Sequence, residues 1–157
     1  MKDRIYVAMI VVASILVIGG FFLPLSLYIT PKSGLGYDLG IIGASMMGIL
    51  FLYSARKYFK FMANLANMKT WLHAHIFLGI FGPICILYHS CYSLGAVNSN
   101  VALWSMIVVS ISGFVGRFLY NRVGWERPFK WWHFAHLPFV GMLVLAAIAH
   151  IIASFFY

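Results

Sequence analysis

Histidine is the residue type in this chain whose number and spacing point most directly to chemistry. His75 and His89 are fourteen positions apart, and so are His136 and His150. In an α-helix fourteen positions return the chain to within about 40° of the starting direction, so both histidines of each pair share a face. They are separated along the helix axis by roughly 21 Å. Because neutral imidazole is a common axial ligand of haem iron, the spacing indicates two ligand positions on each of two helices.

The helices that carry these histidines are predicted to span a membrane. Apolar residues make up 63% of the 157 residues and charged residues 9%, which excludes an ordinary soluble domain. A spanning helix needs about 20 apolar residues. The charge-free runs supply five such segments, two of which are separated by a polar turn at 95–100. We therefore predict a single all-α membrane domain over residues 1–157, with helices at about 5–29, 38–55, 71–93, 101–121 and 131–156.

The positive charge of the chain predicts its orientation. A formal net charge of +8 could suggest a nucleic-acid partner, but five helices would place ten of the eleven Lys and Arg residues on the side of the N-terminus. This positive-inside pattern predicts a cytoplasmic N-terminus, an outer C-terminus and a location in the inner (cytoplasmic) membrane. Lys32 is the exception. Membrane lipids, and no nucleic acid, are the expected partners of the ten: Lys2, Arg4, Arg56, Lys57, Lys60, Lys69, Arg117, Arg122, Arg127 and Lys130.

The same topology pairs the histidines by depth. One helix separates the third from the fifth, so these two run in the same direction. His75 is then level with His136 near the inner side, and His89 is level with His150 near the outer side. Each pair could ligate one iron from both faces, which predicts two b-type haems stacked across the bilayer. There is no Cys-x-x-Cys-His sequence, so covalent haem attachment is not expected.

Small and basic residues near the histidines are candidates for contact with a cofactor. Gly79 and Gly82 lie on the face that His75 and His89 share, where a porphyrin would need small side chains. Ordinary helix packing explains such glycines equally well. Arg117, close to the inner end of the fourth helix, could bind a haem propionate. It could also be a snorkelling side chain that orients the helix.

His73 and His133 are interpreted differently from the other four histidines. They lie near the expected inner boundary beside tryptophans, where polar and aromatic residues are common, so we favour an interface role. The alternatives are hydrogen bonds to a haem propionate or a site for a quinone headgroup. The candidates for a quinone pocket are His73, Lys69, Trp71 and His133.

Two His-x13-His pairs on the third and fifth helices resemble the membrane domain of the ferric reductase and NADPH oxidase superfamily. The matching stretches run from His75-Ile-Phe-Leu-Gly79 to His89, and from His136-Leu-Pro138 to His150. The resemblance covers helices three to five, about half of the chain, and more loosely the rest. The resemblance implies that the two pairs bind two b haems through which electrons cross the membrane. Eukaryotic members add a flavin and nicotinamide domain after the last helix and usually have a sixth helix. Neither is expected here, so the chain is more similar to a stand-alone prokaryotic subunit.

Three functions are compatible with these features. The first is a di-haem cytochrome b subunit, an electron carrier that is not itself a complete enzyme, working with an iron–sulfur, flavin or multihaem c-type subunit. The second is a quinol-oxidising membrane anchor of a respiratory oxidoreductase. The third is a structural or metal-transporting subunit without haem, although a transporter would be expected to have carboxylates in the membrane and only Asp38 comes near.

Overall fold

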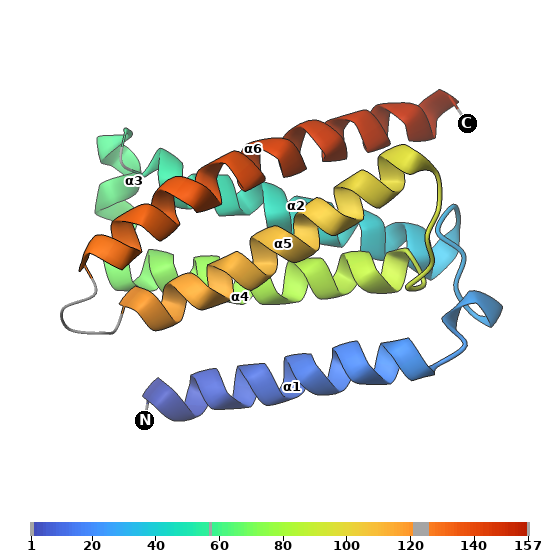
Figure 1. The fold of residues 1–157 in the computed structure, drawn as a ribbon, viewed down its shortest axis with the longest axis horizontal. Coiled ribbons are helices and arrows are strands. Elements are labelled where there is room, and N and C mark those ends of the chain that lie inside the picture. The colour runs from blue at the N-terminus through green and yellow to red at the C-terminus, as the bar shows by residue number, and fades with distance from the viewer. Residues whose placement is uncertain (1, 57, 121–125, 157) are drawn as a thin grey trace. The chain divides into compact units, whose positions relative to one another are not determined.

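A computed structural model describes residues 2–56, 58–120 and 126–156 and shows a helical chain (Figure 1). Lys57 and Arg122, two of the basic residues counted above, lie outside this part. Five long helices are joined by a short 3₁₀ turn, η1 (Leu25–Leu27), a short helix, α3 (Lys60–Leu65), and connecting loops. The long helices are α1 (Lys2–Phe22), α2 (Gly34–Ala55), α4 (Met68–His89), α5 (Val97–Tyr120) and α6 (Glu126–Phe156).

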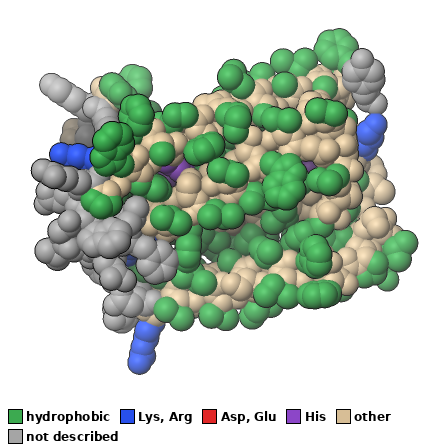
Figure 2. Space-filling model, in the orientation of Figure 1, with side chains coloured by type: hydrophobic (Ala, Val, Ile, Leu, Met, Phe, Trp, Pro, Cys, Tyr) green, Lys and Arg blue, Asp and Glu red, His purple; other side chains and the backbone are tan. Residues whose placement is uncertain are grey.

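The five long helices are all long and apolar enough to cross a membrane. Their outer surfaces carry large apolar side chains, such as Ile15 and Leu145, that are 64% and 73% exposed. Figure 2 shows these side chains over most of the visible face, with the visible Lys and Arg groups towards the helix ends. Such a surface requires lipid around it. The predicted all-α membrane bundle of five helices is therefore confirmed, and the orientation of the termini stays a prediction.

Two helix ends differ from the expected positions for local reasons. The first helix was expected to continue to residue 29 but ends at Phe22. Pro24 explains this end, because proline lacks an N–H group and disfavours helical geometry in the residue before it. The third long helix was expected to reach residue 93 but ends at His89. Cys91 and Tyr92 follow with φ values of 50° and 55°, a left-handed conformation that terminates a helix.

The chain divides into two compact units, one covering Met1–Ser93 and the other Leu94–Tyr157. We call them the N-terminal unit and the C-terminal unit. The histidines at 75 and 89 belong to the first, and those at 136 and 150 belong to the second. Whether both units act together as one cytochrome domain stays a prediction.

In the N-terminal unit α2 and α4 pack as an antiparallel pair through small residues (Figure 1). A Cβ atom at Gly43 would lie 2.8 Å from Ile86 Cδ1, and one at Gly82 would lie 3.2 Å from Met47 Cγ. Glycine at these positions lets the two backbones approach closely, as is common between membrane helices. The backbone of α2 is thereby brought close to one face of α4.

Helix α1 is attached to α4 by two tyrosine hydroxyls. Tyr88 donates a hydrogen bond to the Leu16 carbonyl at 2.9 Å, and Tyr92 donates one to the Val17 carbonyl at 3.1 Å. Gly20 makes this approach possible, because a Cβ atom there would lie 2.7 Å from the Tyr92 hydroxyl. These two hydrogen bonds attach the C-terminal part of α1 to α4.

The C-terminal unit is a hairpin of α5 and α6 (Figure 1). Its most closely packed point is Gly116, where a Cβ atom would overlap the indole ring of Trp132. The indole Nε1 donates a hydrogen bond to the Ser112 carbonyl at 2.7 Å. Ser105, Met106 and Leu143 are buried further along the hairpin. These contacts fix the register of the two helices.

Candidate functional site

Burial separates the six histidines into the same two groups as their spacing. His75, His89, His136 and His150 are each half-buried, whereas His73 and His133 are exposed. The four histidines at fourteen-residue spacing are therefore the ones that the helices partly enclose. We describe them first, one unit at a time.

His89 is held against the backbone of α2. Its Nδ1 atom lies 2.8 Å from the Gly36 carbonyl oxygen. A carbonyl can only accept a hydrogen bond, so Nδ1 must carry the proton, and the lone pair of the neutral ring is on Nε2. Gly40 allows the ring to sit there, because a Cβ atom at this position would lie 2.7 Å from Nδ1. Helix α2 thus determines which nitrogen of His89 can bind a metal.

His75 lies against the other end of α2. Its ring centroid is 4.9 Å from that of Tyr53, and the ring faces the Leu50 backbone carbonyl. The Nδ1 atom is nevertheless buried without a partner that meets hydrogen-bond geometry among the described residues. Gly36 and Leu50 are themselves fourteen positions apart, so α2 has one backbone carbonyl close to His89 and one close to His75.

His136 is held by a side chain of α5. Its Nδ1 atom lies 2.6 Å from the Ser112 hydroxyl, which also lies 2.8 Å from the Val109 carbonyl. A hydroxyl that gives its single proton to this carbonyl can accept the Nδ1 proton of His136, which leaves the lone pair of the ring on Nε2. The ring also stacks on Trp132, at a centroid distance of 5.1 Å and an interplanar angle of 25°.

His150 is half-buried further along α6. The contacts of Ser112 with His136 and of Gly116 with Trp132 set an antiparallel register between α5 and α6. Continued to the other end of the hairpin, this register places Asn98 level with His150. His136 thus has the polar residue Ser112 at its own level, and the register predicts Asn98 at the level of His150.

The predicted small residues differ in what surrounds them. A Cβ atom at Gly79 would meet nothing within 4 Å, so there is open space beside the helix four residues after His75. Gly82 instead is buried in the contact between α4 and α2. Its contacts favour the helix-packing interpretation, and a porphyrin contact at Gly82 stays a prediction. Pro83 lies inside α4, so the Gly79 carbonyl lacks the usual N–H donor four residues later.

The remaining candidates lie near the ends of the helices. Arg117 is half-buried in the last turn of α5. The ring of His73 lies 5.7 Å from that of Tyr6 on α1, and the ring of His133 lies 6.3 Å from that of Trp132. Lys69 is exposed in the first turn of α4. The propionate and quinone roles of these residues stay predictions.

Trp71, the other residue of the expected quinone pocket, has a distinctive environment. The residue is half-buried, and its indole Nε1 is shielded from solvent and has no hydrogen-bond partner among the described residues. The Nε atom of Arg56 is in the same condition. Buried donors without partners are uncommon and call for an acceptor. A ligand that carries carbonyl or carboxylate oxygens would satisfy them.

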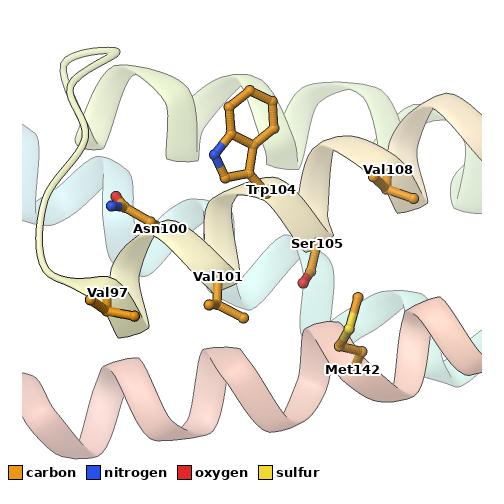
Figure 3. A pocket seen from close by; sticks show the side chains of 7 residues that line it. All are labelled: Val97, Asn100, Val101, Trp104, Ser105, Val108 and Met142. Carbon is orange, nitrogen blue, oxygen red and sulfur yellow. The ribbon is translucent and has the colours of Figure 1, made fainter.

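The C-terminal unit also contains an open groove of ≈ 340 Å³ along α5. Figure 3 shows Ser105 on the side of α5 that faces Met142 of α6, whereas Trp104 projects from the opposite side of the helix. Almost all of the lining is apolar, as expected for a surface that contacts lipid or another apolar group. The lining residues are Val97, Asn100, Val101, Trp104, Ser105, Val108 and Met142.

Sequence reasoning missed the residues that contact the ring nitrogens. Ser112, Gly36 and Gly40 were not among the residues predicted to contribute to the site. No sequence signal marks Gly36, because it acts through a backbone carbonyl, which every residue has. None marks Ser112 either, because its role depends on the register of α5 against α6.

Among the described residues, no group of three or more His, Cys, Asp or Glu side chains is placed to hold a metal ion. Comparisons of the chain with protein-family models, curated proteins and solved structures found no match.

Proposed function

We propose that the chain is a di-haem b-type cytochrome that carries electrons across a membrane. In this proposal His75 and His136 ligate one haem, and His89 and His150 ligate the other. The observation that carries the proposal is the hydrogen bonding of Nδ1 in His89 and His136. Histidines that bind metal usually donate this proton to a carbonyl or another acceptor, which fixes the ring and directs Nε2 to the metal.

The chain's own residues would position the cofactors. Bis-histidine haem supplies reversible one-electron transfer at iron. The Gly36 carbonyl and the Ser112 hydroxyl hold the rings of His89 and His136 in one tautomer. Two histidines separated by roughly 21 Å on one helix would place the two haems towards opposite sides of the bilayer.

The proposal includes a location and partners. The distribution of Lys and Arg supports an inner (cytoplasmic) membrane with the N-terminus inside. The haem of His75 and His136 would then be the inner one. In this proposal the haems exchange electrons with other subunits. An iron–sulfur, flavin or multihaem c-type subunit has suitable chemistry.

A visible spectrum of the purified protein tests the proposal directly. We expect a reduced-minus-oxidised spectrum of low-spin, six-coordinate b haem, and two haems per chain by pyridine haemochrome. One haem per chain would mean that only one histidine pair is used. An intact protein without haem would contradict the proposal and favour a structural or metal-binding subunit.

A quinol-oxidising anchor is the second candidate, and Trp71 is the observation that favours it. Its indole Nε1, on α4, is a buried donor without a hydrogen-bond partner among the described residues. A quinone carbonyl could accept a hydrogen bond from this indole. A quinol analogue should then shift the haem spectrum, and Trp71→Phe should weaken that shift. A spectrum that is unchanged at saturating analogue would exclude this candidate.

A further inference from the structure

We propose that Ser112 is a positioning residue that holds His136 in the Nδ1–H tautomer and lowers the reduction potential of the haem that His136 ligates. The first part concerns the chain alone. The second part rests on the proposed function. The two parts are measured separately, so failure of one does not hide the other.

The geometry around Ser112 gives its hydroxyl two partners with different roles. The Val109 carbonyl, three residues earlier on the same helix, lies 2.8 Å from the hydroxyl oxygen and can only accept. His136 Nδ1 lies at 2.6 Å. With its single proton directed to Val109, the hydroxyl becomes an acceptor for the imidazole. The result is a chain of two hydrogen bonds, from His136 Nδ1 to the Ser112 hydroxyl and from that hydroxyl to the Val109 carbonyl.

Two further contacts keep the serine and the imidazole in place. The Trp132 indole donates to the Ser112 carbonyl at 2.7 Å and stacks on the His136 ring. Gly113 does not crowd the imidazole, because a Cβ atom at this position would lie 3.9 Å from His136 Cε1, an ordinary contact distance. Serine, tryptophan and histidine therefore form one connected group within the C-terminal unit.

This group determines how His136 can act as a ligand. A neutral ring that donates from Nδ1 has its lone pair on Nε2. Donation from Nδ1 also makes the ligating nitrogen more basic. A more basic ligand stabilises ferric iron more than ferrous iron, so the reduction potential falls. Removing the hydroxyl should therefore raise the potential of this haem.

A simpler explanation is that the Ser112 hydroxyl only donates a hydrogen bond to a backbone carbonyl of its own helix. Serine in a membrane helix often bonds a carbonyl three or four residues earlier. Ser110 does so on the same helix, with its hydroxyl 2.7 Å from the Met106 carbonyl. Ser110 therefore provides a matched control, because its substitution removes the same kind of bond to the backbone and leaves the Ser112–His136 bond in place.

The tautomer is tested by ¹⁵N NMR of histidine in the full-length chain, prepared in detergent without added haem. A spectrum of His136→Asn assigns the His136 signals by their loss. We expect wild type, Ser110→Ala and Ser112→Thr to show Nδ1–H at His136, because all three retain a hydroxyl at position 112. Ser112→Ala should show exchange between tautomers. An Nε2–H tautomer in wild type, or an unchanged tautomer in Ser112→Ala, would overturn the inference.

The potential is tested by a redox titration of the haem-loaded protein. Ser112→Ala should raise the midpoint potential of one haem and leave the other unchanged, and Ser112→Thr should restore the wild-type value. Loss of such a contact typically weakens metal binding by about 10–100-fold, so Ser112→Ala should also release this haem more readily. Equal potentials in wild type and Ser112→Ala would overturn this part. A chain that binds no haem would refute the proposed function, while the NMR result would still decide the tautomer.

Discussion

The two units hold their histidines by different chemistry. In the N-terminal unit the acceptor for His89 is the backbone carbonyl of Gly36, whereas in the C-terminal unit the acceptor for His136 is the side chain of Ser112. A backbone carbonyl is present whatever residue occupies the position, so substitution acts on it only through nearby packing. A hydroxyl is lost with a single substitution. The same result, a proton fixed on Nδ1, is thus more robust to mutation in one unit than in the other.

The largest expected effect comes from removing a histidine in either unit. His89→Ala and His150→Ala should each remove one haem and leave most of the other, because a bis-histidine site cannot form with one ligand. His75→Ala and His136→Ala should remove the other haem. Pyridine haemochrome should then give about half of the wild-type haem in each case.

His73→Ala and His133→Ala are the matched controls for this experiment. Both residues are exposed, and both variants should retain two haems. Wild-type haem content in any of the four ligand variants would show that the assignment of ligands is wrong. Loss of a haem in either control would show that fourteen-residue spacing does not identify the ligands.

Adding a methyl group next to His89 or next to His136 should have clearly different effects in the two units. Gly40→Ala would place a Cβ atom 2.7 Å from His89 Nδ1, so the ring must move and the Gly36 hydrogen bond must break. Overpacking of this kind costs about 1–3 kcal/mol, and we expect one haem to be lost. Gly113→Ala would place its Cβ atom 3.9 Å from His136 Cε1 and should be tolerated. Thermal unfolding and haem content measure both.

Gly48→Ala is the control for the backbone of α2. Nothing lies within 4 Å of a Cβ atom at this position. Alanine is a better helix former than glycine, by roughly 0.5–1 kcal/mol, so this variant should be as stable as wild type or slightly more so. Equal haem loss in Gly40→Ala and Gly48→Ala would show that the contact with His89 is unimportant.

A smaller effect is expected at Trp132, which supports the serine in the C-terminal unit. Trp132→Phe keeps an aromatic ring beside His136 but removes the Nε1 donor to the Ser112 carbonyl. The lost hydrogen bond should cost about 0.5–1.5 kcal/mol. Both haems should remain, with a small shift in the potential of one. Two unchanged potentials would show that the indole does not help to position Ser112.

The smallest expected effect is a pH dependence of the hydrogen bond that attaches α1 to the rest of the N-terminal unit. Burial, together with the neighbouring Tyr88, raises the pKa of Tyr92 from 10.0 to about 12. The neutral hydroxyl, which donates to Val17, is therefore favoured by the fold. Its contribution to stability should be complete below pH 10 and should disappear as the pH rises towards about 12. The difference in phenolate absorbance between wild type and Tyr92→Phe measures this titration, and an ordinary midpoint near 10 would contradict it.

The sequence predicted the long helices well because the membrane requirement is strong. Runs without charge of about 20 residues have few alternatives in a chain this apolar. Helix ends were less well predicted, because they depend on local bonds. Helix α4 begins at Met68, where the Asn67 side chain accepts a hydrogen bond from the Thr70 amide at 2.9 Å. Helix α5 begins at Val97, inside the polar turn that was expected to separate two spans.

The candidate site was predictable only in part. Spacing selects four histidines, and these are the half-buried ones. It does not identify the acceptors of their Nδ1 protons. Gly36 acts through its carbonyl, which every residue has, and Ser112 differs from Ser110 only in the partner that the facing helix brings to it. Such roles depend on the register between helices, which a single sequence does not specify.

The positions of the Ser112–His136 and Gly36–His89 hydrogen bonds in the chain have a consequence for the order in which the protein folds and takes up a cofactor. Ser112 and His136 are 24 positions apart in one hairpin of two consecutive helices. Contacts this local form early and require no partner from the rest of the chain. The imidazole is thus oriented as soon as the hairpin is inserted, and the same holds for His89 once α2 and α4 have paired. An arriving cofactor would meet rings that already point the right way, so little ordering would remain for its capture.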